Sequence, residues 1–348
     1  MIDASAVPTV SVIIPTYNCD RYIVRAVESV LQQSGCTFEI IIIDDGSTDS
    51  TEAVLEPYRD REAYPAGNRL RYVKQENQGV AAARNHGIEI ARADYIAFLD
   101  ADDYFLPDKL VRQAEILFKR ADVGIVHSGW QRVDSMGNKL LDVRPWSQIP
   151  ELDLENWLRW KPVLPSAMMF RREWLEYVGG FDPRFPPAED TNLVLKLTLK
   201  GCKTAWLREI TVCYRQHESS AMHKGLPQAR SLMAVTDDFF AQPNLPPEVK
   251  LMEQSVRHGT LVWIAWYLHH TGHQTATIEY LQQAWNYRVN SGVETLVTWV
   301  ESFKEFASNW GVEFNPNRLT SSPEWQELVR WVLQTTSPSD RRVIHDRN

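Results

Sequence analysis

Roughly the first hundred residues alternate short runs of β-branched residues with stretches whose apolar residues recur every three or four positions. The β-branched runs cover 10–15, 38–43, 70–74 and 95–99, and they predict strands. The periodic stretches cover 21–33, 50–58 and 80–91, and they predict helices. This alternation predicts an α/β fold with a mostly parallel sheet between helices. Ile40 to Ile43 lack polar alternation, which is typical of a central strand buried on both faces.

The rest of the chain continues with mixed elements and then becomes helical. A helix is expected over 109–120, a strand over 123–133, and a hairpin turn over 134–138. Residues 145–165 give the weakest signal and predict loops. A linker-like stretch at 242–247 precedes a helical pattern that extends to near Thr335. We therefore expect a catalytic domain over 1–225 and a C-terminal helical extension over 226–348.

Polar and acidic residues follow the predicted strands, at the edge of the sheet where ligands bind in this fold class. They are Thr16, Tyr17, Asp44, Asp45, Asp100, Asp102 and Asp103. Helix capping explains part of such a pattern, and Ser47, Thr48 and Asp49 are suited to it. The pair Asp100 and Asp102 is the sharpest feature, because two carboxylates spaced by one residue after a buried strand can converge on Mg²⁺ or Mn²⁺.

The charge of the chain, its short apolar runs and its N-terminus argue against several classes of protein. The chain has 348 residues, and 37 Lys and Arg against 45 Asp and Glu give a formal charge of −8. This acidic balance argues against nucleic acid as a partner. No apolar run reaches the roughly 18 residues of a membrane span, and the N-terminus does not resemble a secretory signal. We expect a cytoplasmic protein with four reduced cysteines, and an amphipathic C-terminal helix leaves peripheral contact with the inner face of a membrane open.

Several motifs together resemble the inverting glycosyltransferases of family 2, which have the GT-A type of nucleotide-diphospho-sugar transferase fold. They are VSVIIPTYN at 10–18, IIIDDGSTD at 41–49, NQGVAAARNHG at 77–87, FLDADD at 98–103, GGFD at 179–182 and ED at 189–190. Their order and spacing are also those of the family, and the resemblance covers about residues 8 to 220. It implies a Rossmann-like sheet sandwiched by helices.

The resemblance also implies roles for individual residues. The nucleotide would be bound by Thr16, Tyr17, Asp44, Asp45, Arg84 and Asp100, and a metal ion, Mn²⁺ or Mg²⁺, by Asp102, Asp100 and His217. In the family a carboxylate at the position of Asp44 or Asp45 can accept a hydrogen bond from the imide N–H of uracil. The resemblance therefore favours UDP or dTDP as the nucleotide of the donor. For Arg84 the competing interpretation is an arginine on a helix surface, and for His217 it is a structural histidine.

The mechanism that the resemblance implies is a single displacement with inversion at the anomeric carbon. It needs a general base for the acceptor hydroxyl, and Asp190 matches that position, with Glu189 beside it. These two residues precede an amphipathic stretch at 191–200, so a helix cap or dipole partner is the competing explanation.

The sequence thus predicts a metal-dependent transferase that moves a sugar from a UDP-sugar, or a dTDP-sugar, to a hydroxyl acceptor. The acceptor would be a cell-surface polysaccharide, a glycan or a lipid-linked precursor. Two alternatives remain: a non-catalytic module that binds nucleotide sugars, and a sugar nucleotidyltransferase. The second would need a glycine-rich basic loop for a triphosphate, and none is present near the N-terminus.

Overall fold

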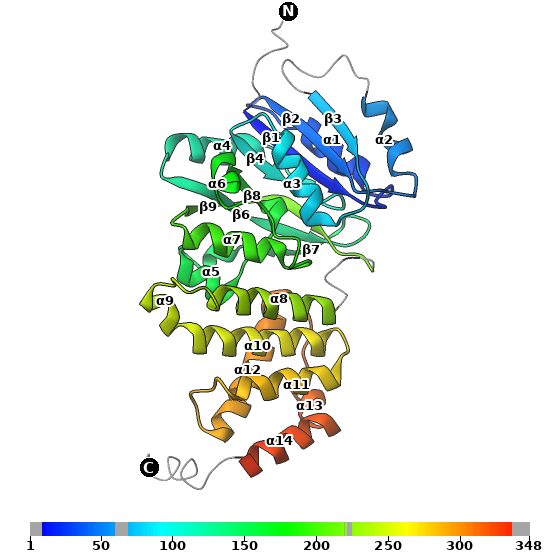
Figure 1. Ribbon diagram of the computed structural model, residues 1–348. Coiled ribbons are helices and arrows are strands. Elements are labelled where there is room, and N and C mark those ends of the chain that lie inside the picture. Colours follow the sequence, from blue (N-terminus) through cyan, green and yellow to red (C-terminus); the bar gives the residue numbers. More distant parts are fainter. Residues whose placement is uncertain (1–8, 60–68, 219, 221–224, 336–348) are drawn as a thin grey trace, which may run out of the picture. The chain divides into compact units, whose positions relative to one another are not determined.

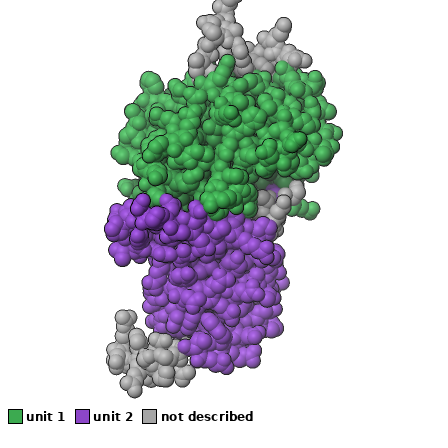
Figure 2. All heavy atoms as spheres, viewed as in Figure 1, with its two compact units in different colours: residues 1–219 green, residues 220–348 purple. Residues whose placement is uncertain are grey.

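The computed structural model describes residues 9–59, 69–218, 220 and 225–335 (Figure 1). Contacts between residues divide the chain into two compact units, Met1–Ser219 and Ser220–Asn348 (Figure 2). The domain division after residue 225 stays a prediction.

The first part of unit 1 alternates strands and helices as the sequence pattern predicts. In chain order these are β1 (Val10–Thr16), α1 (Ile23–Leu31), β2 (Phe38–Asp44), α2 (Thr51–Arg59), β3 (Arg69–Lys74), α3 (Val80–Ile90) and β4 (Tyr95–Phe98). The four strands lie in the order β3, β2, β1, β4, and all three pairings are parallel. The carboxyl ends of these strands therefore face the same edge of the sheet.

The second part of unit 1 extends the same sheet with mixed pairing. It contains β5 (Tyr104–Phe105), α4 (Lys109–Lys119), β6 (Val123–Val133), β7 (Lys139–Val143), η1 (Pro145–Ser147), α5 (Leu154–Trp160), η2 (Pro165–Ala167), β8 (Met168–Arg171), α6 (Arg172–Tyr177), α7 (Glu189–Leu199) and β9 (Lys203–Arg215). Beyond β4 the order is β8, β6, β9, β5, and β7 pairs with β6. Of these pairings only β6 with β9 is parallel, so the parallel character is concentrated in the first four strands.

The core of unit 1 lies on both faces of the sheet. Every residue of β1 and β2 is buried, including Ile40 to Ile43, which confirms the central strand. The predicted hairpin joins β6 to β7. The loop prediction for 145–165 is wrong at α5, where the Asp153 side chain accepts a hydrogen bond from the backbone N–H of Asn156 and begins a helix.

Unit 2 is entirely helical in its described part, as predicted. It comprises α8 (Leu226–Phe240), α9 (Pro247–Leu251), α10 (Glu253–His270), α11 (Gln274–Trp285), α12 (Gly292–Trp310), α13 (Pro316–Thr320) and α14 (Pro323–Thr335). Buried aromatic residues such as Trp266, Trp299 and Phe303 form its core. No helix in the described residues has the length and apolar character needed to cross a membrane. The four cysteines of the chain are free thiols, as expected.

A lysine side chain is buried in the core of unit 1. Lys109, the first residue of α4, is fully buried; its ammonium group donates to the Gln113 side chain and lies 4.6 Å from the centre of the Phe105 ring. Gln113 in turn donates to the carbonyl of Ala167 at 2.9 Å. Burial lowers the pKa of Lys109 to about 7, because a charged ammonium is poorly solvated there.

Replacement of Lys109 by methionine should change how stability depends on pH. Between about pH 7 and pH 9 the unfolded lysine holds a proton that the folded lysine has lost, so the wild type gains stability as pH rises, by about 2 kcal/mol, and Lys109→Met does not. Urea unfolding at the two pH values measures this difference. Lys119→Met, at an exposed position of the same helix, is the control. Identical pH dependence in the wild type and Lys109→Met would contradict the prediction.

Candidate active site

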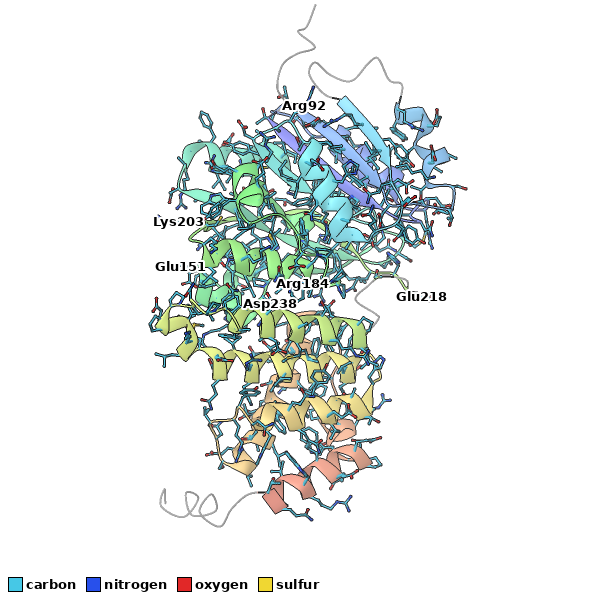
Figure 3. All side chains as sticks on the ribbon, viewed as in Figure 1. Arg92, Glu151, Arg184, Lys203, Glu218 and Asp238 are labelled. Carbon is cyan, nitrogen blue, oxygen red and sulfur yellow. The ribbon has the colours of Figure 1, made fainter. Side chains whose placement is uncertain are left out.

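The residues that follow β1, β2 and β4 lie at one edge of the sheet, together with the start of α7 and the end of β9. Figure 3 labels Arg92, before β4, and Glu218, after β9, at opposite ends of the unit 1 sheet. The predicted site residues belong to the end marked by Glu218. Their side chains are connected by hydrogen bonds between segments that are distant in the sequence.

Asn18 joins the loop after β1 to the loop after β2. Its backbone N–H donates to the Ser47 hydroxyl at 2.9 Å, and its side-chain oxygen accepts from the backbone N–H of Thr48 at 2.8 Å. Asn18 has a φ of 49°, a left-handed conformation that asparagine tolerates better than most residues. Sequence reasoning missed this role, although the asparagine ends a motif that it singled out.

Asp44 and Asp45 organise the loops around the predicted nucleobase pocket. Asp44 accepts from the Ser47 N–H at 2.7 Å and from the Tyr72 hydroxyl. Asp45 accepts from the backbone N–H groups of Gln78 at 2.9 Å and Gly79 at 2.7 Å, which lie just before α3. Both carboxylates are buried, so part of their role is structural, and base recognition stays a prediction.

Thr16 and Tyr17, the other two residues predicted for that pocket, differ in exposure. Thr16 is buried and its hydroxyl has no hydrogen-bond partner among the residues that the structure describes, whereas Tyr17 is 53% exposed. An exposed ring beside a buried hydroxyl can present one aromatic face to a planar ligand. The predicted role of both residues in nucleotide binding stays a prediction.

Arg84 is the central cation of the site. It is buried on α3, and its guanidinium donates to Asp100 and to Glu189, each at 2.6 Å. Burial alone would lower its pKa, but the charges of Asp100 and Glu189 outweigh burial and raise it above its usual value. The competing interpretation of Arg84 as a helix-surface arginine is therefore wrong. Arg84 connects the loop after β4 to α7.

Asn85 connects α3 to the GGFD motif. Its amide donates to the carbonyl of Phe181 at 2.8 Å and accepts from the Phe181 N–H at 2.8 Å. Gly180 has a φ of 71°, and a Cβ there would lie 2.4 Å from the Asn85 side-chain oxygen. Glycine is thus required for the approach of this backbone to Asn85.

Glu189 and Asp190 lie in the first turn of α7. The helix cap is Ala188, which has no capping side chain, so the two acids are not caps in the strict sense. Asp190 is half-buried and accepts from the Thr191 N–H at 2.5 Å. Burial, together with the charge of Glu189, raises the pKa of Asp190 to about 7 despite the opposing charge of Arg84. A carboxyl with such a pKa suits proton transfer near neutral pH.

The DxD motif meets the end of β9. The Asp102 carboxylate lies 2.9 Å from Nε2 of His217, and Asp103 accepts from the backbone N–H of Arg215 at 3.0 Å. The Arg215 side chain also donates to the Asp102 carbonyl at 2.9 Å. The sequence analysis did not single out Arg215. Its position two residues before His217 could have indicated that it lies near the DxD motif.

Two of the three residues predicted to bind a divalent cation lie close together. Within the described part of the chain no group of three or more His, Cys, Asp or Glu side chains could hold a metal ion, so metal binding stays a prediction. Asp102 and His217 nevertheless converge, and Asp100 lies one residue away from Asp102 in a turn. Burial, followed by the charges of Asp102 and Asp100, raises the pKa of Asp103 well above its usual value.

Buried polar atoms without hydrogen-bond partners also gather around this site. Within the described residues they include Thr16 Oγ1, Arg84 Nε, Asp103 Oδ2, Glu189 Oε2 and Asn192 Oδ1. Such atoms are rare in folded proteins and are expected where a ligand or water completes the hydrogen bonds. Asn192 was not predicted, since an asparagine within a helix carries no sequence signal for binding.

Comparisons with known proteins agree with the motifs. The family model described as glycosyl transferase family 2 matches residues 11–179. Chondroitin synthase of Escherichia coli is 34% identical over 201 residues, which cover 56% of this chain and 27% of that protein. Hyaluronan synthase of Pasteurella multocida is 32% identical over 210 residues, which cover 60% of this chain and 20% of that protein. The chain thus spans less than a third of the length of these two synthases.

Two solved structures resemble the chain over most of its length. Staphylococcus aureus TarS 1–349 in complex with UDP-GlcNAc has 18% identity and a TM-score of 0.59, with 88% of this chain and 93% of that chain covered. The mannosyltransferase PcManGT from Pyrobaculum calidifontis, in complex with GDP-Man and Mn²⁺, has 18% identity and a TM-score of 0.62, with 100% and 90% covered. These likenesses confirm the predicted fold class, a GT-A α/β sheet with a helical C-terminal region.

Substitution of Gly180 by alanine should destabilise unit 1 more than substitution of Gly179. Both glycines have positive φ, so each alanine costs about 1 kcal/mol in backbone strain. Only Gly180→Ala displaces Asn85, which adds about 1 to 3 kcal/mol for unpaired polar groups. Denaturant unfolding of Gly179→Ala, Gly180→Ala, Asn85→Ala and the double variant Asn85→Ala/Gly180→Ala measures the coupling between Gly180 and Asn85. Strictly additive effects would show that the Asn85 contact is not the cause.

Proposed function

The chain belongs to glycosyl transferase family 2, and we propose that it is a metal-dependent, inverting glycosyltransferase that uses a nucleoside-diphosphate sugar, with a UDP-sugar favoured over a dTDP-sugar. The observation that carries this proposal is the buried Arg84, which is paired with both Asp100 and Glu189. This one side chain links the acidic motif after β4, suited to metal and diphosphate, with the helix start that carries Asp190, suited to proton removal.

The donor end of the proposed site consists of Thr16, Tyr17, Asp44, Asp45, Arg84, Asp100, Asp102 and His217. A carboxylate of the Asp44 and Asp45 pair would accept the imide N–H of a pyrimidine base. Their oxygens already accept backbone N–H groups, but each carboxylate oxygen can accept more than one hydrogen bond. Asp102, Asp100 and His217 would hold Mn²⁺ or Mg²⁺, which would neutralise charge on the departing diphosphate.

The acceptor end depends on Asp190. In the proposed reaction the acceptor oxygen forms a bond to the anomeric carbon while the bond from that carbon to the diphosphate breaks, and Asp190 takes the hydroxyl proton. One displacement inverts the configuration. The pKa of about 7 means that Asp190 is ionised in a large fraction of molecules at neutral pH and is still basic enough to take the proton. Glu189 contributes to the basicity of Asp190, because its negative charge raises the pKa of Asp190.

The two alternatives are less well supported. A non-catalytic module that binds nucleotide sugars would not need a carboxyl with a raised pKa, but Asp190 has one. A sugar nucleotidyltransferase would need a glycine-rich basic loop for a triphosphate. The residues after β1, Tyr17 to Asp20, contain neither glycine nor a basic residue.

The proposed acceptor is a hydroxyl of a polysaccharide, a glycan or a lipid-linked precursor. Its support is the similarity to chondroitin and hyaluronan synthases, which are named for polymers of sugars. A cytoplasmic location and a peripheral membrane contact stay predictions.

Donor binding should depend on both metal and Asp102. Calorimetry with UDP, dTDP and GDP, each with and without Mn²⁺, should show metal-dependent binding of UDP or dTDP, and Asp102→Ala should weaken it at least about tenfold. Asp122→Ala, which removes an exposed carboxylate that pairs with Arg120, is the matched control. Binding that is indifferent to metal and to Asp102, or a preference for GDP, would contradict the proposed donor site.

Asp190→Asn should abolish transfer while donor affinity is kept. Loss of a general base typically costs about 10² to 10⁴ in rate. In the wild type, kcat/KM should rise about tenfold per pH unit below pH 7 and level off above it, because the base must lose its proton first. The assay is release of UDP from UDP-sugars with an acceptor panel, and Glu176→Gln, an exposed carboxyl on α6, is the control. Full activity of Asp190→Asn would disprove the assignment.

A further inference from the structure

Three arginines and two tyrosines form a continuous stack beside the candidate metal residues. The guanidinium of Arg21 lies 5.1 Å from the centre of the Tyr22 ring, and that of Arg215 lies 4.9 Å from the same ring. Arg215 also lies 5.3 Å from the Tyr104 ring, which Arg25 approaches at 4.9 Å. We call these five residues the arginine–tyrosine stack. It joins the start of α1, β5 and the end of β9.

The stack touches the candidate active site directly. The Tyr22 ring packs against His217, with 4.9 Å between ring centres, and His217 contacts Asp102. Arg215 donates to the Asp102 carbonyl and, at 3.0 Å, to the Ser135 carbonyl in the turn between β6 and β7. The two ends of the stack, Arg21 and Arg25, are exposed.

Neither Arg21 nor Arg25 has a carboxylate within ion-pair distance among the residues the structure describes. Most other exposed arginines of unit 1, such as Arg112, Arg144 and Arg184, pair with a nearby acid, whereas Arg208 has no ion pair among the described residues. The arrangement is notable in a chain with 45 acidic residues and a net charge of −8.

The aromatic rings hold the arginines in place. A guanidinium that lies over a tyrosine ring keeps its N–H groups at the rim of the plane, where they can donate to an oxyanion. The rings thus restrict the arginines before any ligand arrives, which lowers the entropic cost of binding. Arg215, which is buried, lies against both rings.

We propose that Arg21 and Arg25 form a subsite for an anionic group, a phosphate or a carboxylate, on the acceptor substrate. The inference rests on the proposed transferase function. An acceptor with negative charge would be repelled by Asp100, Asp102 and Asp103, and the exposed arginines supply the compensating charge next to them. In the proposed site a metal ion would neutralise the donor diphosphate, so we assign the two arginines to the acceptor.

The test uses inorganic phosphate as the probe and the full chain labelled with ¹⁵N-arginine, in the presence of EDTA so that no metal ion binds phosphate. NMR follows the Nε resonances, which are assigned by substitution. Phosphate should shift the Arg21 and Arg25 resonances saturably at millimolar concentrations. Arg25→Gln should weaken this binding at least about fivefold, because a charge-assisted hydrogen bond is lost. Arg208→Gln, which removes an exposed arginine of β9, should leave it unchanged.

A second arm separates the acceptor from the donor as the source of the anion. Saturating UDP should leave phosphate binding at Arg25 intact, and Arg25→Gln should leave UDP affinity in Mn²⁺ unchanged. Competition between UDP and phosphate at Arg25 would assign the arginines to the donor diphosphate and overturn the proposal. Absence of a saturable shift, or equal weakening in Arg208→Gln, would overturn it as well. Failure of UDP to bind at all, with phosphate bound at Arg25, would instead count against the proposed transferase function.

Discussion

The buried ion pairs of Arg84 are the interaction on which the rest of the candidate site depends. One guanidinium on α3 holds Asp100, which follows β4, and Glu189, which begins α7. A charge buried without a partner is costly, by about 3 to 5 kcal/mol when one side of such a pair is removed. The three segments are therefore constrained to meet, and Asp190 is placed next to the acidic edge of the sheet.

The other motifs are also held by side chains that form hydrogen bonds from one motif to the next. Asn18 binds the loop after β2, Asp45 binds the start of α3, and Asn85 binds Phe181. Each contact uses backbone groups that would otherwise be unpaired in a loop. Polar residues in these motifs thus stabilise the loops in addition to any role in binding. Their presence alone does not establish catalysis.

Charge is distributed unevenly across the site, and this has chemical consequences. Burial and neighbouring acids raise the pKa of both Asp103 and Asp190. The same excess of negative charge that suits a divalent cation also keeps Asp190 a stronger base than an ordinary carboxylate. The arginine–tyrosine stack lies against this acidic edge and supplies charge of the opposite sign, with Arg215 in contact with both.

The sequence by itself determined the order of strands and helices in unit 1, the central position of Ile40 to Ile43, and the set of polar residues at the strand ends, because hydrophobic periodicity is a local property. It missed α5, since one capping contact from Asp153 decides that helix. Only the tertiary structure decided that Arg84 is buried between two acids and that three arginines share two tyrosine rings. Arg84 and Glu189 are 105 positions apart in the sequence, and no local pattern encodes which distant side chain pairs with a buried charge.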